Sequence, residues 1–89
     1  MTLTTMTEKE VIEITNKAIS DEFEFDLEQM IPTAHLYKDL GLDSLDAVDL
    51  VLVLEKAFGV KLRNQPEVKE VRTLEDIYKL ILQLQQAAA

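Results

Sequence analysis

The sequence predicts an all-α fold: a small four-helix bundle of three long helices and a short third helix, with a long first loop. Apolar residues recur at helical spacing in three separate segments, and convincing strand alternation occurs nowhere. The chain has 89 residues, enough to bury one core. Residues 1–89 are therefore expected to form a single domain, with residues 1–6 and 85–89 frayed at its ends.

The first helix should begin at Thr7, because Thr7-Glu8-Lys9-Glu10 has the form of a capping box. We expect it to end between Ser20 and Glu22. Its core-facing stripe is predicted to contain Val11, Ile14, Ala18 and Phe23, with Ile12 and Ile19 beside it.

The segment 23–43 should be an ordered loop. Pro32 stops any helix in it, and Gly41 supplies a flexible backbone close to Ser44. Loops of this length are usually functional or contain a short helical turn of their own, and we expect such a turn at 35–40. Apolar side chains should anchor the loop to the bundle: Leu27, Ile31, Leu36, Leu40 and Leu42.

A second helix is predicted from Ser44 or Leu45 to Phe58, where Gly59 stops it. It is apolar over most of its circumference, as expected of the central helix in a small bundle. One row should be exposed: Asp46, Asp49, Val53 and Lys56.

The remaining chain should contain a short helix at 67–71, after Pro66, and a longer final helix that begins at a second cap, Thr73-Leu74-Glu75-Asp76. The buried face of the final helix is predicted to consist of Leu74, Ile77, Tyr78, Ile81 and Leu84.

Composition excludes several functions. With 17 acidic and 9 basic residues the net charge is −8, which disfavours a nucleic-acid partner and favours basic protein surfaces. The absence of cysteine excludes disulfides, a zinc ribbon and a thiol nucleophile on the polypeptide. Because the sequence has no secretory signal and no apolar stretch long enough to span a bilayer, we expect a cytoplasmic protein with no membrane span.

Ser44 is the candidate functional residue. A hydrolase built from Ser44, His35 and an aspartate is one hypothesis, but a small helical bundle offers little concave surface for a catalytic triad and a substrate pocket. We therefore expect no catalytic residues. Nor do we expect a metal site, because Asp39, Asp43 and Asp46 lack the ligand spacing of a calcium loop.

The favoured interpretation treats Ser44 as an acceptor, since a phosphate ester at a helix N-terminus meets free amides and a favourable dipole. The run from Asp39 to Asp46, DLGLDSLD, followed by AVDLVLVLEKAFGVKL, resembles the acyl carrier proteins. The resemblance extends from about Val11 to Leu82 and rests on the combination of motif, central helix, loop, small size, acidity and absence of cysteine.

The resemblance implies that a phosphopantetheinyl transferase attaches 4′-phosphopantetheine to Ser44 from coenzyme A. The arm would carry acyl groups as thioesters among separate enzymes of fatty-acid or polyketide-type synthesis, while the polypeptide itself catalyses nothing. We expect the protein to be a monomer. Two alternatives stay open. One is an unmodified acidic interaction domain for other proteins, and the other is a carrier of an amino-acid or aryl cargo.

The resemblance also implies a docking face for partner enzymes with basic patches. Its predicted contacts are Asp43, Leu45, Asp46, Asp49, Leu52 and Glu55. Val48 is predicted to pack in the core instead. Lys56 departs from the family pattern, in which an acid is common at this position, and so does the rather basic segment 62–72.

Overall fold

The computed structural model describes residues 7–62 and 65–88, with side chains described as far as residue 84. The described chain contains three α-helices and two 3-10 helices. These are α1 (Glu8–Phe23), η1 (Leu27–Gln29), α2 (Ser44–Phe58), η2 (Pro66–Glu70) and α3 (Leu74–Ala88). Within these described ranges there is no β-strand, so the predicted all-α class is confirmed. Of the residues expected to fray, 1–6 and 89 lie outside the description, while residues 85–88 continue the backbone of helix α3.

The expected four-helix bundle is not confirmed, because the short third helix is the 3-10 helix η2. It starts with Pro66 and covers five residues before Val71 returns to an extended backbone, with φ −67° and ψ 130°. A segment of five residues completes little more than one α-helical turn, and 3-10 helices occur mainly as short pieces of this kind. The bundle therefore has three α-helices.

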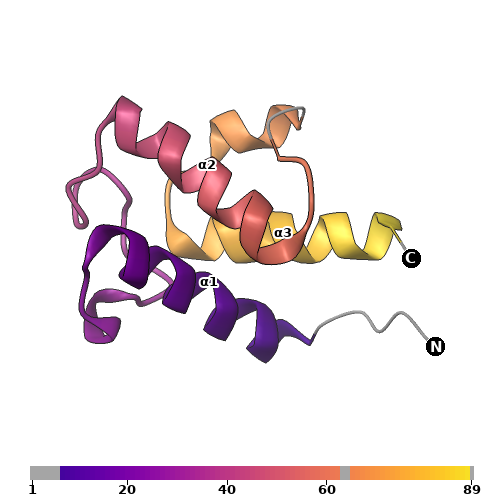
Figure 1. The fold of residues 1–89 in the computed structure, drawn as a ribbon, viewed down its shortest axis with the longest axis horizontal. Helices are drawn as coiled ribbons and strands as arrows, with labels where there is room; N and C mark the ends of the chain where they lie inside the picture. The colour runs from indigo at the N-terminus through magenta and orange to yellow at the C-terminus, as the bar shows by residue number, and fades with distance from the viewer. Residues whose placement is uncertain (1–6, 63–64, 89) are drawn as a thin grey trace.

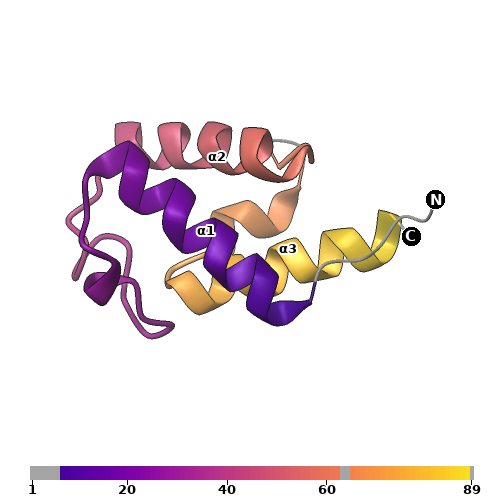
Figure 2. The same ribbon diagram turned by 60° about the horizontal axis from the view of Figure 1, so that its bottom comes forward.

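Helix α1 packs against both α2 and α3. Figures 1 and 2 both place the 24–43 loop, the start of α2 and the start of α3 at one end of the long axis, with the C-terminal end of α3 opposite. The long first loop is thus gathered around the point where α2 begins.

The capping box at Thr7 is confirmed, because the Glu10 amide donates to the Thr7 hydroxyl and the Thr7 amide donates to the Glu10 carboxylate. Helix α1 ends slightly later than expected, at Phe23, where Glu24 adopts a left-handed backbone with φ 59°.

After Val11, the buried stripe of α1 is displaced by one position from the predicted stripe. Val11, Thr15 and Ile19 are buried, whereas Ile14 and Ala18 are only half-buried. The true stripe steps by four residues and includes a threonine, which an apolar pattern passes over. The Thr15 hydroxyl has no hydrogen-bond partner among the described residues.

Two of the residues predicted to anchor the loop are exposed, and two other residues of the loop are buried. Leu27 is 64 % exposed and Ile31 is 51 % exposed, while Met30 and Ala34 are buried in their place. The chain turns tightly here, since the Met30 amide donates to Leu27 and the Ile31 amide donates to Gln29, and these turns direct Met30 to the core. The other predicted anchors are buried as expected: Leu36, Leu40 and Leu42.

Among the helices, α3 supplies the most buried side chains of the core. Its buried side chains are Leu74, Ile77, Tyr78, Leu80 and Ile81, with Leu84 half-buried. The Tyr78 hydroxyl donates to the Asn16 side chain of α1, and the Asn16 amide group donates to the Met30 carbonyl. Burial raises the pKa of Tyr78 above its ordinary value, although the hydrogen bond to Asn16 acts in the opposite direction. This polar link ties α1, the loop and α3 together.

Candidate functional site

Ser44 is the first residue of α2, and its side chain is exposed. The backbone amides of Ser44 and Leu45 find no acceptor among the described residues, as expected for the first turn of a helix. An exposed hydroxyl therefore stands beside free amide donors and the positive end of the helix dipole. This is a favourable place for an anionic group on the serine.

Asp43 and Asp46 form a reciprocal cap around Ser44. The Asp46 amide donates to Asp43 Oδ1 over 2.9 Å, and the Asp43 amide donates to Asp46 Oδ2 over 3.2 Å. Both carboxylates thus have a structural role at the start of α2. The sequence reasoning missed this cap, although the Asp-x-x-Asp spacing signals it.

The loop that precedes Ser44 is held by backbone hydrogen bonds. Gly41 adopts a left-handed backbone with φ 72°, where a residue with a Cβ is strained. The Leu42 amide then donates to Leu36 over 3.0 Å, and the Leu36 amide donates to Arg72 over 2.9 Å. The approach to Ser44 is therefore fastened to the residue just before α3.

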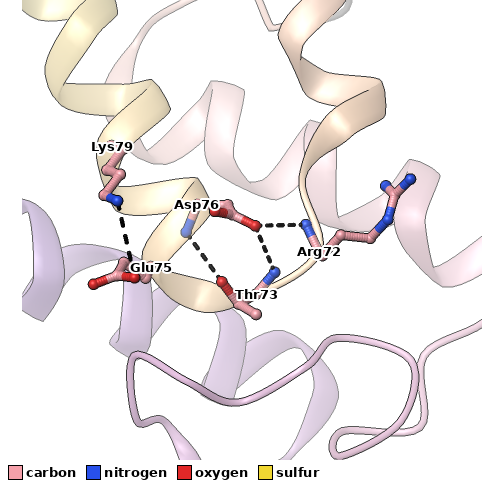
Figure 3. Close-up of polar contacts among 5 residues, drawn as sticks. All are labelled: Arg72, Thr73, Glu75, Asp76 and Lys79. Atoms are coloured by element: carbon pink, nitrogen blue, oxygen red, sulfur yellow. Dashed lines mark hydrogen bonds and ion pairs between the residues drawn. The ribbon is translucent and has the colours of Figure 1, made fainter.

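The start of α3 is itself capped, as predicted (Figure 3). The amides of Arg72 and Thr73 donate to Asp76 Oδ2 over 3.0 and 3.1 Å, and the Asp76 amide donates to the Thr73 hydroxyl. Partial burial raises the pKa of Asp76, but these hydrogen bonds and the nearby Lys79 ammonium outweigh it, and the net pKa lies below the ordinary value. The cap fixes Arg72, and with it the loop that leads to Ser44.

His35 helps to form the expected turn at 35–40. Its Nδ1 accepts from the amides of Tyr37 and Lys38, and the Asp39 carboxylate accepts from the backbone amide of His35 over 2.7 Å. In a catalytic triad the carboxylate instead pairs with a ring nitrogen of the histidine. The hydrogen bonds of His35 and Asp39 therefore support the loop and give no support to the hydrolase hypothesis.

Helix α2 presents an apolar stripe to solvent directly after Ser44. Leu45 is 78 % exposed, Val48 59 % and Leu52 42 %. The predicted burial of Val48 is wrong. At about 100° per residue, Val48 lies on roughly the opposite side of the helix from Leu50, which is buried together with Leu54. The apolar stripe Leu45–Val48–Leu52 is larger than the sequence predicted.

The other predicted docking acids differ in their surroundings. Asp49 is exposed, and its carboxylate makes no hydrogen bond or ion pair with another described residue. Glu55 is half-buried, and its Oε2 accepts from the Leu62 amide over 2.8 Å. In the row predicted to be exposed, Asp49 and Lys56 are exposed while Asp46 and Val53 are half-buried.

Comparison with known proteins identifies the family. Residues 16–81 match the family described as the phosphopantetheine attachment site, which covers most of the chain. The chain belongs to the acyl carrier protein family. It is 33 % identical over 76 residues to an acyl carrier protein of Thermosynechococcus vestitus, covering 85 % of this chain and 93 % of the relative. It is 39 % identical over 72 residues to acyl carrier protein 2 of Ralstonia nicotianae, covering 81 % of this chain and 88 % of the relative.

The cofactor of this carrier is phosphopantetheine, and the residues at the start of α2 fit such a group. An exposed hydroxyl, two free amides and a helix N-terminus together suit a phosphodiester. Among the described residues no group of three acidic, histidine or cysteine side chains is placed to hold a metal ion. No helix in that part of the chain is both long and apolar enough to cross a bilayer.

The carrier also contains a small apolar cavity of about 70 Å³ between α2, η2 and α3. One lining residue, Ala47, lies in the first turn of α2, three residues after Ser44 in the sequence. Tyr37 is the lining residue with a polar group on its side chain. The other lining residues are aliphatic, among them Leu50, Leu54, Leu62 and Ile81.

Proposed function

We propose that Ser44 is the residue that carries 4′-phosphopantetheine, and that the protein tethers acyl groups as thioesters on this arm. The observation that supports Ser44 most strongly is its contrast with Ser20, the other serine in the chain. Ser20 is buried and its hydroxyl donates to the Lys17 carbonyl, whereas Ser44 is exposed at a helix N-terminus. A transferase therefore has one accessible serine to modify.

When bound, the arm supplies the thiol that this chain, without cysteine, lacks. The polypeptide holds Ser44 at the surface, offers free amides to the phosphodiester and catalyses no reaction itself. The fixed loop, joined to Arg72 through Leu36, keeps the attachment point in one position while the arm moves.

The cavity between α2 and α3 favours an aliphatic cargo of the fatty-acid or polyketide type. Its volume of about 70 Å³ is smaller than the ~150 Å³ of a cavity that holds one benzene molecule. It would therefore take the first few carbons of an acyl chain, and a longer chain would have to push α2 and η2 apart. The aliphatic lining gives less support to an amino-acid cargo, whose ammonium group would be left unpaired there.

The proposed partners are a phosphopantetheinyl transferase and acyl-chain enzymes with basic docking patches. The apolar stripe Leu45–Val48–Leu52 and the exposed Asp49 offer the most accessible contacts. Asp43, Asp46 and Glu55 remain proposed contacts in addition to their hydrogen bonds within the chain. A monomer in the cytoplasm is the form that suits such a shuttle.

Incubation with coenzyme A and a broad-specificity phosphopantetheinyl transferase tests this proposal by intact mass. The wild-type protein and Ser20→Ala should each gain the mass of one phosphopantetheine, while Ser44→Ala should gain none. The assignment would be refuted if Ser44→Ala gained the full mass. It would also be refuted if neither the wild type nor Ser20→Ala gained mass with any of several transferases.

A further inference from the structure

The side chain of His35 is built into the turn that precedes Ser44. Its Nδ1 accepts hydrogen bonds from the backbone amides of Tyr37 and Lys38, each over 3.2 Å. A ring nitrogen accepts only while it carries no hydrogen, so the turn uses the neutral imidazole with its hydrogen on Nε2. The ring nitrogen thus does for this turn what the side-chain oxygen of an N-cap residue does for a helix.

The turn is connected to Ser44 and to the start of α3. The Leu42 amide, two residues before Ser44, donates to the Leu36 carbonyl over 3.0 Å. On the other side, His35 and Thr73 form an isolated antiparallel bridge. A change in the turn at His35 is therefore passed on to the segment that presents Ser44.

We propose that His35 is a positioning residue for the attachment of phosphopantetheine to Ser44, and that protonation of its ring weakens this positioning. Once Nδ1 carries a hydrogen, it is a donor that faces two other donors, the amides of Tyr37 and Lys38. Both hydrogen bonds are then lost, and the turn loses its cap. The inference rests on the proposed function in one respect, since Ser44 must be the attachment site.

The titratable groups on the segments that pack against His35 belong to other residue types. They are Tyr37, Lys38 and Asp39 in the same turn, and Arg72, Glu75 and Asp76 at the start of α3. Carboxylic acids, phenols, lysines and arginines ordinarily titrate well outside the range from about pH 5.5 to about pH 7.5, whereas histidine titrates within it. Because His35 is the single histidine of the chain, a side-chain response in this range is assigned to it.

Transferase kinetics at about pH 7.5 and about pH 5.5 test the proposal with two variants that differ in one acceptor. Asparagine carries Oδ1 at the position of Nδ1 and accepts at both pH values, whereas alanine has no acceptor. At the higher pH, kcat/KM of His35→Asn should equal that of the wild type. His35→Ala should be lower by up to about fivefold, the size expected for the loss of one cap.

At the lower pH the wild type should lose kcat/KM relative to His35→Asn and approach His35→Ala. Each comparison is made at one pH, so the pH dependence of the transferase itself cancels. A purely structural contribution of the ring to packing would not follow the pH in this way, and asparagine would not restore it.

Amide chemical shifts of the unmodified, isotope-labelled protein test the cap without a transferase. Between the two pH values, the amide signals of Tyr37 and Lys38 should move in the wild type and stay in place in His35→Asn. The Glu10 amide, which donates to the Thr7 hydroxyl, is the reference and should stay in place in both proteins.

Equal pH responses of the wild type and His35→Asn, in the amide shifts or in the kinetics, would overturn the proposal. Modification of His35→Ala at the wild-type rate at the higher pH would also overturn it. Because the amide shifts are read from unmodified protein, a failure of the cap and a failure of the carrier assignment are separately visible.

Discussion

Replacing Asp43 with alanine removes the side chain that caps α2 directly before Ser44. Asp43 Oδ1 accepts from the Asp46 amide over 2.9 Å, and the partner hydrogen bond from the Asp43 amide to Asp46 depends on the same turn. Loss of an aspartate N-cap costs about 1 kcal/mol of unfolding free energy. In a domain of this size, that cost lowers the melting temperature by roughly 4–8 °C.

Two matched variants separate the cap from the charge. Asp43→Asn keeps an N-cap oxygen of similar strength and should lose much less stability than Asp43→Ala. Asp49→Ala removes an exposed carboxylate without a partner and should change the unfolding free energy by no more than about 0.5 kcal/mol. Urea denaturation, monitored by far-ultraviolet circular dichroism, measures the unfolding free energies of Asp43→Ala, Asp43→Asn and Asp49→Ala.

The same variants should differ in their modification by a phosphopantetheinyl transferase. Asp43→Ala loosens the turn that presents Ser44 and should lower kcat/KM more than Asp43→Asn does. If Asp43→Ala is as stable as Asp49→Ala, the capping argument is wrong. If Asp43→Asn and Asp43→Ala lose kcat/KM equally while only the alanine variant is destabilised, the carboxylate acts through its charge.

Three further predictions concern other parts of the molecule. The pKa of Asp76 is lower in the folded protein, so its carboxylate stabilises the fold at pH values above its ordinary pKa of 3.8. This stabilisation is lost as the pH falls through the lower pKa of the folded state. Acid unfolding curves of the wild type should therefore show a loss of stability in this range that Asp76→Asn lacks. Val48→Asp should remain folded in urea titrations, within about 0.5 kcal/mol of the wild type, whereas Leu50→Asp should unfold because it buries an unpaired charge. Asp49→Lys should lower kcat/KM of the transferase more at low than at moderate salt, and an equal effect at both would contradict an electrostatic role.

The sequence predicted the elements whose signals are local. Helix α2 runs from Ser44 to Phe58 as expected, because Gly59 can adopt the left-handed backbone, φ 67°, that ends it. The caps at Thr7 and Thr73 were equally readable, since each depends on residues three positions apart. The position of Ser44 at a helix start followed from the same signals.

The errors arose where tertiary packing decides. The helix crossing, which no local pattern encodes, selects Thr15 over Ile14 for the core of α1. Because α2 is apolar over most of its circumference, its sequence did not show whether Val48 lies on the buried or the exposed side of the helix.

The central claim is that Ser44 carries an acylated phosphopantetheine arm. Trypsin should release residues 39–56 as one peptide, because cleavage follows Lys38 and Lys56, and Ser44 is its single serine. Mass spectrometry of this peptide, from protein isolated from its native cells, is predicted to show one phosphopantetheine that bears an aliphatic thioester released by hydroxylamine. A peptide that is unmodified in every preparation would contradict the account.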